Sequence, residues 1–232
     1  MKPDLIVALD VSSATEAAAL VRRIGNAVSF YKVGLELFVA DGPDTLAMLN
    51  DNGKRVFLDL KLHDIPRTVA RAVASASRFG AELLTLHAAG GKAMIQAAAQ
   101  AAADAGTEMR LLAVTVLTSL DGTDLADIGV MRSALDQVDA LGRLAVEAGA
   151  HGLVCSPKEV GRLRAALGVA PYLVTPGVRP AGGDLGDQKR VATPAQATRD
   201  GASALVVGRP IVEAADPRAA ALAIAAECAG VR

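Results

Sequence analysis

The sequence predicts one domain over residues 1–232 with a (β/α)8 barrel fold, the TIM-barrel architecture. Three observations support this. Short apolar runs occur eight times, at residues 5–9, 30–33, 56–60, 83–86, 111–116, 153–155, 172–174 and 204–207. The first five begin at residues 5, 30, 56, 83 and 111, so the intervals of 25, 26, 27 and 28 residues each fit one strand-plus-helix unit. Ala-rich segments with helix-forming composition lie between the runs.

Each run is interpreted as a strand of a parallel sheet, because it is continuously apolar, as expected of strands buried on both faces. Helices are expected at residues 15–24, 68–78, 92–105 and 141–148, with glycines suited to helix ends at Gly25, Gly80, Gly106 and Gly149. The stretches 121–135 and 178–195 are expected to be loops within the domain. An open doubly wound sheet is the alternative fold. It loses its main support because the first strand is followed by DVSS and not by GxGxxG.

The composition excludes several classes of protein. Hydrophobic residues make up 52% of the chain and charged residues 21%, which is typical of a folded domain and not of a disordered chain. No apolar run approaches the ~18 residues that span a bilayer, so no membrane partner is expected. The net charge of -1 provides no basic field for nucleic acid, and local cations must hold any anionic ligand. With two distant cysteines and no signal-peptide pattern, the chain is expected in the cytoplasm.

Polar side chains gather at the ends of the predicted strands, which is where the ligands of a (β/α)8 barrel bind. The first four strands carry or end in such residues, and so do the loops after strands five, seven and eight. They are Asp10, Lys32, Asp59, Lys61, Asp64, His87, Thr118, Ser119, Arg179, Gly208 and Arg209. A shared barrel rim would bring these side chains together around one site.

The centre of this pattern is the sequence DLKLHDIP on the third strand. Residues two apart in a strand share a face, so Asp59 and Lys61 are expected to point into the barrel mouth, with the leucines beside them facing the helices. Asp64 follows just before the next helix. A structural ion pair is the simplest interpretation of an Asp-x-Lys pattern. Lys32 and Asp10 at the same rim favour a functional site instead, because buried unpaired charges would cost several kcal/mol each.

The loops after strands seven and eight are expected to bind an anion. Barrel phosphate sites are often built from these two loops, which here contain Arg179 and Arg209. Gly208 lets backbone N–H groups approach a phosphate closely, and Arg209 can add a bidentate contact. One arginine alone would be explained by a surface salt bridge, whereas two in these loops favour a phosphate site. Gln188 in the loop after strand seven is either a further phosphate donor or a solvated side chain.

The remaining candidates are interpreted as structural or left open. His63 is expected to support the site from behind or to pack against a helix, and His87 is left without a role. Cys155 ends a strand with no base beside it in the sequence, so it is interpreted as a small buried hydrophobic residue. No HxH, HExxH or carboxylate triad with metal-ligand spacing occurs, so no metal is predicted.

The motifs together resemble one enzyme family. They are IVALD at the start, YKVG on strand two, FLDLKLHDIPRTV on strand three, VLTS after strand five, and TPGVRP and VVGRPI after the last two strands. In this order, over nearly the whole chain, they are similar to the orotidine 5'-phosphate decarboxylases. DLKLHDIP is highly specific, whereas VVGRPI alone indicates only a phosphate-binding barrel. The resemblance implies decarboxylation of orotidine 5'-phosphate to UMP and CO2, the last step of UMP biosynthesis, without a metal or an organic cofactor.

The resemblance also implies a role for each matching residue. Lys61 would protonate C6 of the pyrimidine within a charged network that includes Lys32, Asp59 and Asp64. Some residues would reach the substrate from the neighbouring subunit of a homodimer: Asp64, Ile65 and Thr68. Others would hold the substrate: Asp10 and Lys32 at the ribose, Thr118 at the pyrimidine, and Arg179, Gln188, Gly208 and Arg209 at the phosphate.

Two other functions fit parts of the pattern. A sugar-phosphate decarboxylase or aldolase on a related barrel has a similar Asp-x-Lys strand, but it stabilises an enediolate with a metal and would lose activity in EDTA. A non-catalytic phosphate-binding sensor would bind UMP without turnover.

Overall fold

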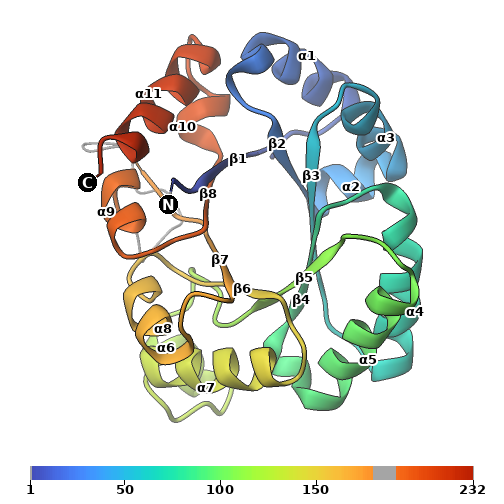
Figure 1. Ribbon diagram of the computed structural model, residues 1–232, viewed down its shortest axis with the longest axis vertical. Coiled ribbons are helices and arrows are strands. Elements are labelled where there is room, and N and C mark those ends of the chain that lie inside the picture. Colours follow the sequence, from blue (N-terminus) through green and yellow to red (C-terminus); the bar gives the residue numbers. More distant parts are fainter. Residues whose placement is uncertain (1, 180–191, 232) are drawn as a thin grey trace.

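The computed structural model describes residues 2–179 and 192–231, which form a closed barrel of eight parallel strands surrounded by helices (Figure 1). The strands follow one another around the ring in chain order, and β8 closes the barrel against β1. Their bounds are β1 Asp4–Ala8, β2 Phe30–Gly34, β3 Arg55–Leu62, β4 Leu83–His87, β5 Arg110–Val114, β6 Gly152–Val154, β7 Tyr172–Thr175 and β8 Ala204–Val207. The predicted (β/α)8 barrel is confirmed, and each predicted strand lies within two residues of an observed one.

Helices fill the connections between the strands. Their bounds are α1 Ala14–Ile24, α2 Leu35–Asp41, α3 Pro43–Asp51, α4 Pro66–Ala76, α5 Gly91–Asp104, α6 Gly122–Asp127, α7 Ala134–Glu147, α8 Val160–Leu167, α9 Pro194–Arg199, α10 Arg209–Val212 and α11 Pro217–Ala229. Three short 3-10 turns are η1 Gly25–Ala27, η2 Ser77–Phe79 and η3 Ala88–Gly90. In the described ranges, no helix combines the length and the apolar character that crossing a membrane requires.

Two apolar layers hold the barrel together. Alternate strand residues fill its interior, among them Phe30, Phe57, Leu83, Leu112 and Val174. The other strand residues pack against the helices, which bury their apolar stripes on the outer face of the sheet. Both faces of each strand are therefore buried, which explains the continuously apolar runs in the sequence.

Two stretches predicted as loops contain helical residues, so that prediction is wrong in part. Residues 121–135 hold α6 and the start of α7, because Asp121 and Ser133 accept hydrogen bonds from the first turns of these helices. The described part of 178–195 contains a bridge between Val178 and Ala192 and the start of α9. A short helix such as α6, and the capped first turn of a longer helix such as α7, escape a search for long Ala-rich segments.

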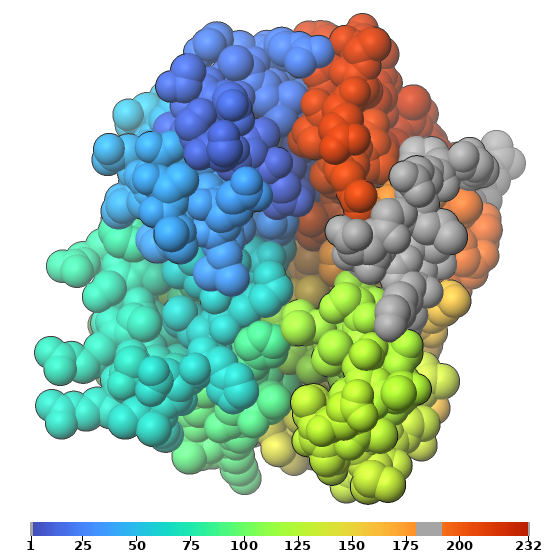
Figure 2. Space-filling model, turned by 180° about the vertical axis from the view of Figure 1, so that it is seen from behind, coloured from blue at the N-terminus to red at the C-terminus, as the bar shows by residue number. Residues whose placement is uncertain are grey.

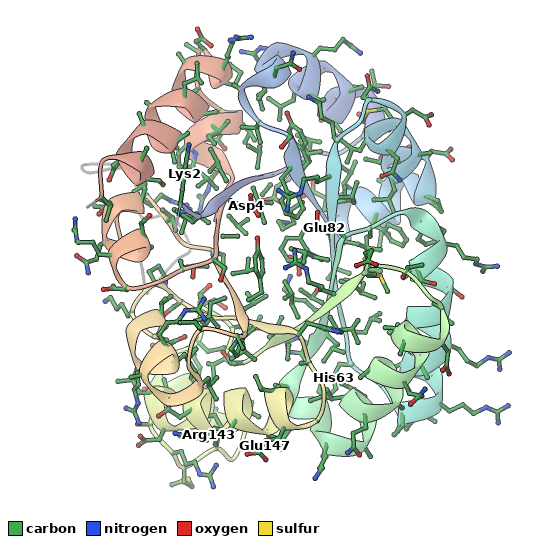
Figure 3. The ribbon with its side chains drawn as sticks, in the orientation of Figure 1. Lys2, Asp4, His63, Glu82, Arg143 and Glu147 are labelled. Atoms are coloured by element: carbon green, nitrogen blue, oxygen red, sulfur yellow. The ribbon has the colours of Figure 1, made fainter. Side chains whose placement is uncertain are left out.

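An ion-pair network closes the end of the barrel where the strands begin, and Figure 3 shows Asp4 and Glu82 near the centre of the ring. Arg55 donates to Asp4 at 3.0 and 3.1 Å and to Glu82 at 2.7 and 2.9 Å. Glu82 also accepts from Arg110 at 2.5 Å, and the Tyr172 hydroxyl donates to Asp4 at 2.7 Å. Charged groups at this end of a (β/α)8 barrel serve stability, since ligands bind at the opposite end.

We expect Glu82→Gln to lower the free energy of unfolding at pH 7 by about 1–2 kcal/mol, because the side chain is partly exposed and solvent screens the pair. The hydrogen bond from Arg55 is the main cause that holds the pKa of Glu82 below its ordinary value, against the opposing effect of burial. A lowered folded pKa stabilises the fold above the unfolded pKa of about 4.3, and this stability is lost as the pH falls through the folded pKa. Denaturant titrations should therefore show the difference between wild type and variant shrinking below about pH 4. A difference that stays constant with pH would contradict the assignment.

Candidate active site

A cavity of about 560 Å³ opens at the C-terminal ends of the strands. Figure 2 shows the molecule from this side, with the yellow-green segment that contains α6 across from the blue N-terminal quarter. The wall of the cavity includes many of the residues predicted from the strand ends: Asp10, Lys32, Asp59, Lys61, Thr118, Ser119, Arg179, Gly208 and Arg209. The fold therefore brings side chains from β1, β2, β3, β5, β7 and β8 to one site.

Four charged side chains alternate in sign along one side of the cavity. The Lys61 ammonium donates to Asp59 Oδ2 at 2.7 Å, and the Lys32 ammonium lies 3.7 Å from the same oxygen. Lys32 in turn donates to Asp10 Oδ1 at 3.0 Å. Lys32 lies within β2, Asp59 and Lys61 lie within β3, and Asp10 lies just beyond β1. These strands are neighbours in the sheet, so the barrel itself brings the charges together.

Asp59 is buried among these charges and remains ionised. Burial on its own raises the pKa of its carboxyl, but the Lys32 and Lys61 ammoniums and the hydrogen bonds from Lys61 and Thr85 outweigh burial, so the pKa lies below its ordinary value. Both ammoniums therefore face a negative charge at neutral pH. Removing such charges from water costs free energy. Arrays of this kind are typical of functional sites, where the charges act on a ligand or substrate.

The strand β3 departs from regular geometry where these charges lie. The pairing of Leu58 with Leu84 on β4 is followed by the pairing of Leu62 with a residue only two positions further along β4. The extra length of β3 is a bulge, a feature common at barrel rims and beside active sites. Lys61 has a φ of 51°, and no other non-glycine residue in the described ranges has a positive φ. This conformation costs about 1–3 kcal/mol. The side chains of Asp59 and Lys61 both line the barrel mouth, as predicted. A bulge in β3, and not the regular alternation of a strand, brings them there.

Gly34 leaves room for the Lys32 ammonium. A Cβ at this position would lie 2.7 Å from Lys32 Nζ and 3.7 Å from an Asp10 carboxylate oxygen. The first distance is shorter than real Cβ contacts allow. The backbone at Gly34 has a φ of -94°, which any residue adopts, so this position requires space and not backbone freedom.

The other side of the cavity is formed by residues that follow β7 and β8. Arg179 follows β7, and Gly208 and Arg209 follow β8. These are the positions at which a (β/α)8 barrel commonly binds phosphate. Gln188, the fourth residue expected at the phosphate, lies in the stretch 180–191, outside the described residues.

Three of the expected site residues are not among those that line the cavity of this chain. Asp64, Ile65 and Thr68 are exposed in the connection from β3 to α4 and in the first turn of α4. The Asp64 carboxylate accepts the backbone N–H of Ile65 at 2.6 Å, and the Ile65 side chain is 67% exposed. The fold of this chain therefore does not bring these residues to the charged array.

Sequence reasoning missed three features of the site. The floor of the cavity is apolar and comes from inward-facing strand residues: Ala8, Phe57, Val114, Val154 and Val206. Glu213, which follows α10, adds a carboxylate to the wall. Thr85 on β4 is buried and donates to Asp59 at 2.8 Å. Inward alternation within the apolar runs would have found the floor, but nothing local marks the other two residues.

Two histidines and one cysteine that the sequence analysis considered lie near the strand ends. His63 is exposed beside His87, with the ring centroids 5.4 Å apart, and its supporting or packing role stays a prediction. Burial, with smaller contributions from His63 and Lys61, lowers the pKa of His87. Cys155 is fully buried in the layer between strands and helices, as predicted. Within the described part of the chain, no group of three or more His, Cys, Asp and Glu side chains could hold a metal ion.

Comparison with known proteins places the chain in a family. The family model described as orotidine 5'-phosphate decarboxylase / HUMPS family matches residues 3–224. A curated relative from Opitutus terrae, named orotidine 5'-phosphate decarboxylase, is 52% identical over 227 residues, which is 98% of this chain and 99% of the relative. A relative of the same name from Anaeromyxobacter sp. (strain K) is 54% identical over 228 residues, which is 97% of this chain and 99% of the relative.

A solved structure agrees with the sequence comparisons. The crystal structure of orotidine 5'-phosphate decarboxylase from Lactobacillus acidophilus superposes with a TM-score of 0.87 at 39% identity, covering 97% of this chain and 99% of that one. The matches in sequence and in structure both extend over nearly the whole barrel and include every strand that contributes to the cavity. The chain therefore belongs to the orotidine 5'-phosphate decarboxylase / HUMPS family.

Proposed function

We propose that this protein decarboxylates orotidine 5'-phosphate to UMP and CO2, with Lys61 protonating C6 of the pyrimidine. The observation that carries the proposal is the Lys61 ammonium, held 2.7 Å from the buried Asp59 carboxylate on the wall of the cavity. Membership of the family supports the reaction, and the two arginines across the cavity support a substrate that carries a phosphate.

The reaction develops negative charge at one carbon, which the ammonium can stabilise. The bond between C6 and the carboxylate carbon breaks, CO2 leaves, and the electron pair stays on C6. No carbonyl is placed to delocalise this carbanion as in a simple β-keto acid. The Lys61 ammonium stabilises the charge by its fixed position and then transfers a proton to C6. The products are UMP and a neutral amine, which takes up a proton from water.

The other cavity residues hold the rest of the substrate. Asp10 and Lys32 contact the ribose hydroxyls, which fits their 3.0 Å ion pair beside Asp59. Thr118, beyond β5, contacts the pyrimidine, and Arg179, Gln188, Gly208 and Arg209 hold the phosphate. The described members of this set line the same cavity as Lys61, which supports these assignments.

The active sites are shared within a homodimer, so that Asp64, Ile65 and Thr68 of one subunit complete the site of the other. Their exposure outside their own cavity supports this arrangement. Large apolar side chains are also exposed on α2, which follows the neighbouring strand: Leu35 is 52% and Val39 80% exposed. A second copy would cover this apolar surface.

We also place the enzyme in the cytoplasm. Both cysteines of the chain, Cys155 and Cys228, are buried thiols, which fits a reducing compartment.

The proposed function is tested by following the loss of orotidine 5'-phosphate absorbance with purified protein treated with EDTA. Turnover under these conditions supports the cofactor-independent decarboxylase. Activity that appears only after a divalent metal is restored would favour the sugar-phosphate decarboxylase or aldolase. Tight UMP binding without turnover would favour the sensor.

Arg209→Ala should distinguish contacts to the phosphate of the substrate from contacts to its pyrimidine. We expect kcat/KM for orotidine 5'-phosphate to fall, and the fall to correspond to a loss of roughly 2–4 kcal/mol of transition-state stabilisation. The reason is that a charge-assisted contact to the phosphate is lost. The slow reaction of the phosphate-free nucleoside should hardly change. Steady-state assays with both substrates check this, and equal losses for both would show that Arg209 is structural.

Gly34→Ala should disturb the charged array without unfolding the protein. The added Cβ displaces the Lys32 ammonium, so we expect kcat/KM to fall at least about tenfold, or ~1.4 kcal/mol. The melting temperature should change little, because the backbone conformation suits alanine. Gly122→Ala, whose added Cβ would meet no atom within 4 Å, is the matched control. Full activity of Gly34→Ala would show that the position of this ammonium is not critical.

A further inference from the structure

Thr85 is a buried polar residue in the middle of an apolar strand. Its neighbours Leu84 and Leu86 belong to the layer under the helices, whereas Leu83 packs inside the barrel. Because side chains alternate along a strand, Thr85 points to the same inner face as Leu83. It lies two residues closer than Leu83 to the C-terminal end of β4, where the cavity opens. The residue is completely buried. A buried hydroxyl needs hydrogen-bond partners, and those of Thr85 are both catalytic residues of the proposed reaction.

The Thr85 hydroxyl connects Asp59 to Lys61. It accepts the backbone N–H of Lys61 at 2.9 Å and donates to Asp59 Oδ1 at 2.8 Å. An N–H can only donate and the hydroxyl has one proton, so the direction of both hydrogen bonds is fixed. Asp59 therefore keeps Oδ2 for the Lys61 ammonium, which donates to it at 2.7 Å.

This contact lies where the ladder between β3 and β4 is interrupted. Regular pairing stops after Leu58 and resumes at Leu62, and Thr85 is the single β4 residue opposite the intervening bulge. In a regular ladder the N–H of Lys61 would bond to the backbone of the neighbouring strand. Here it bonds to a side chain, and Lys61 has its left-handed backbone conformation at this point.

We propose that Thr85 is a positioning residue: its hydroxyl fixes the Asp59 carboxylate and the Lys61 backbone in one geometry and thereby places the ammonium beside C6. The inference rests on the proposed decarboxylation and extends it to a residue that does not line the cavity. Displacing a catalytic group by about 1 Å can cost about a hundredfold in rate, so a contact that holds both residues has a large effect on kcat.

Thr85→Val keeps the branched shape of the side chain and removes the hydroxyl. We expect kcat to fall at least about tenfold, while KM and the Kd of UMP stay within about threefold, because the substrate contacts are unchanged. The acid limb of the pH profile of kcat should move to higher pH, because Asp59 loses a hydrogen bond that lowers its pKa. Thr85→Ser restores the hydroxyl and should return kcat to within about threefold of wild type.

Thr115→Val is the matched control. Thr115 is also buried beyond a strand end, and its hydroxyl donates to the backbone carbonyl of Val154 at 3.1 Å and not to a catalytic side chain. Thr115→Val should lose about as much stability as Thr85→Val does and keep the kcat of the wild type. Wild-type turnover is measured first, because an inactive wild type overturns the proposed function and not the role of Thr85.

Three results, each with active wild type, would overturn the positioning role. They are a Thr85→Val kcat within about threefold of wild type, a Thr85→Ser variant as impaired as Thr85→Val, and an equal loss in Thr115→Val. If Thr85→Val does not fold, Thr85→Ala supplies the same comparison with a smaller side chain, and the serine variant remains the rescue.

Discussion

Lys61→Ala is expected to abolish decarboxylation of orotidine 5'-phosphate while leaving UMP binding within about tenfold, or ~1.4 kcal/mol. The variant loses both the cation that stabilises charge at C6 and the proton that C6 receives. UMP carries no carboxylate at C6, and its phosphate contacts lie on the other side of the cavity, so its binding depends little on this ammonium. Turnover assays and calorimetric titration with UMP measure the two effects separately.

Electrostatic repulsion of the substrate by Asp59 is too weak to replace this stabilisation. Two unit charges about 4 Å apart interact by only about 4 kcal/mol at an effective dielectric constant of about 20. Enzymes lower reaction barriers by roughly 8–23 kcal/mol. In the proposed mechanism, preorganised stabilisation of the carbanion by Lys61 must therefore supply more than repulsion does. Phosphate binding can supply part of the remainder by holding the carboxylate in its unfavourable position.

The control for this prediction is Lys158→Ala, because Lys158 is an exposed lysine outside the cavity. It changes the net charge by the same amount and should retain wild-type turnover and UMP binding. Residual turnover of Lys61→Ala above a few per cent of wild type would reject Lys61 as the proton donor. Loss of UMP binding together with activity would instead indicate that Lys61→Ala disrupts the cavity.

The fold was predictable because its physical constraints act locally along the chain. A parallel strand buried on both faces must be apolar throughout, and one strand-plus-helix unit has a nearly constant length, so the runs and their spacing revealed the barrel. The helices α6 and α7 were predicted poorly because their starts depend on single capping residues, Asp121 and Ser133. Capping by one side chain contributes about 1 kcal/mol, and a single capping residue hardly changes the composition of a segment, so composition alone does not reveal it.

The charged half of the site was predictable for a similar reason, since all parallel strands end at one rim. Asp10, Lys32, Asp59 and Lys61 were placed there by strand position alone, and the cavity contains all four. The bulge in β3 was not predictable, because the hydrogen bond made by the backbone of the left-handed Lys61 goes to Thr85, which is 24 residues away in the sequence. Features that depend on a distant contact leave no local pattern.

Mixing two nearly inactive variants should restore activity if the sites are shared. Lys61→Ala damages the site of its own subunit, whereas Asp64→Ala damages the site of the partner. In a mixed dimer one site carries both lesions and the other carries neither. Random exchange makes about half of the dimers mixed, so about one quarter of all sites should be intact under two-fold symmetry. We therefore expect about a quarter of wild-type activity per site, starting from nearly none.

The matched control mixes Lys61→Ala with Lys32→Ala, because both residues line the cavity of their own subunit. Every mixed dimer of this pair has one lesion in each site, so no activity should return. Native mass spectrometry establishes that exchange has occurred in both mixtures. Recovery only in the mixture with Asp64→Ala requires that Asp64 reach across the interface, since a site built within one subunit has no intact copy in either mixture. If exchange is complete and the Asp64→Ala mixture stays as inactive as its parents, then Asp64 acts within its own subunit, and its exposed position in the connection from β3 to α4 must change when the substrate binds.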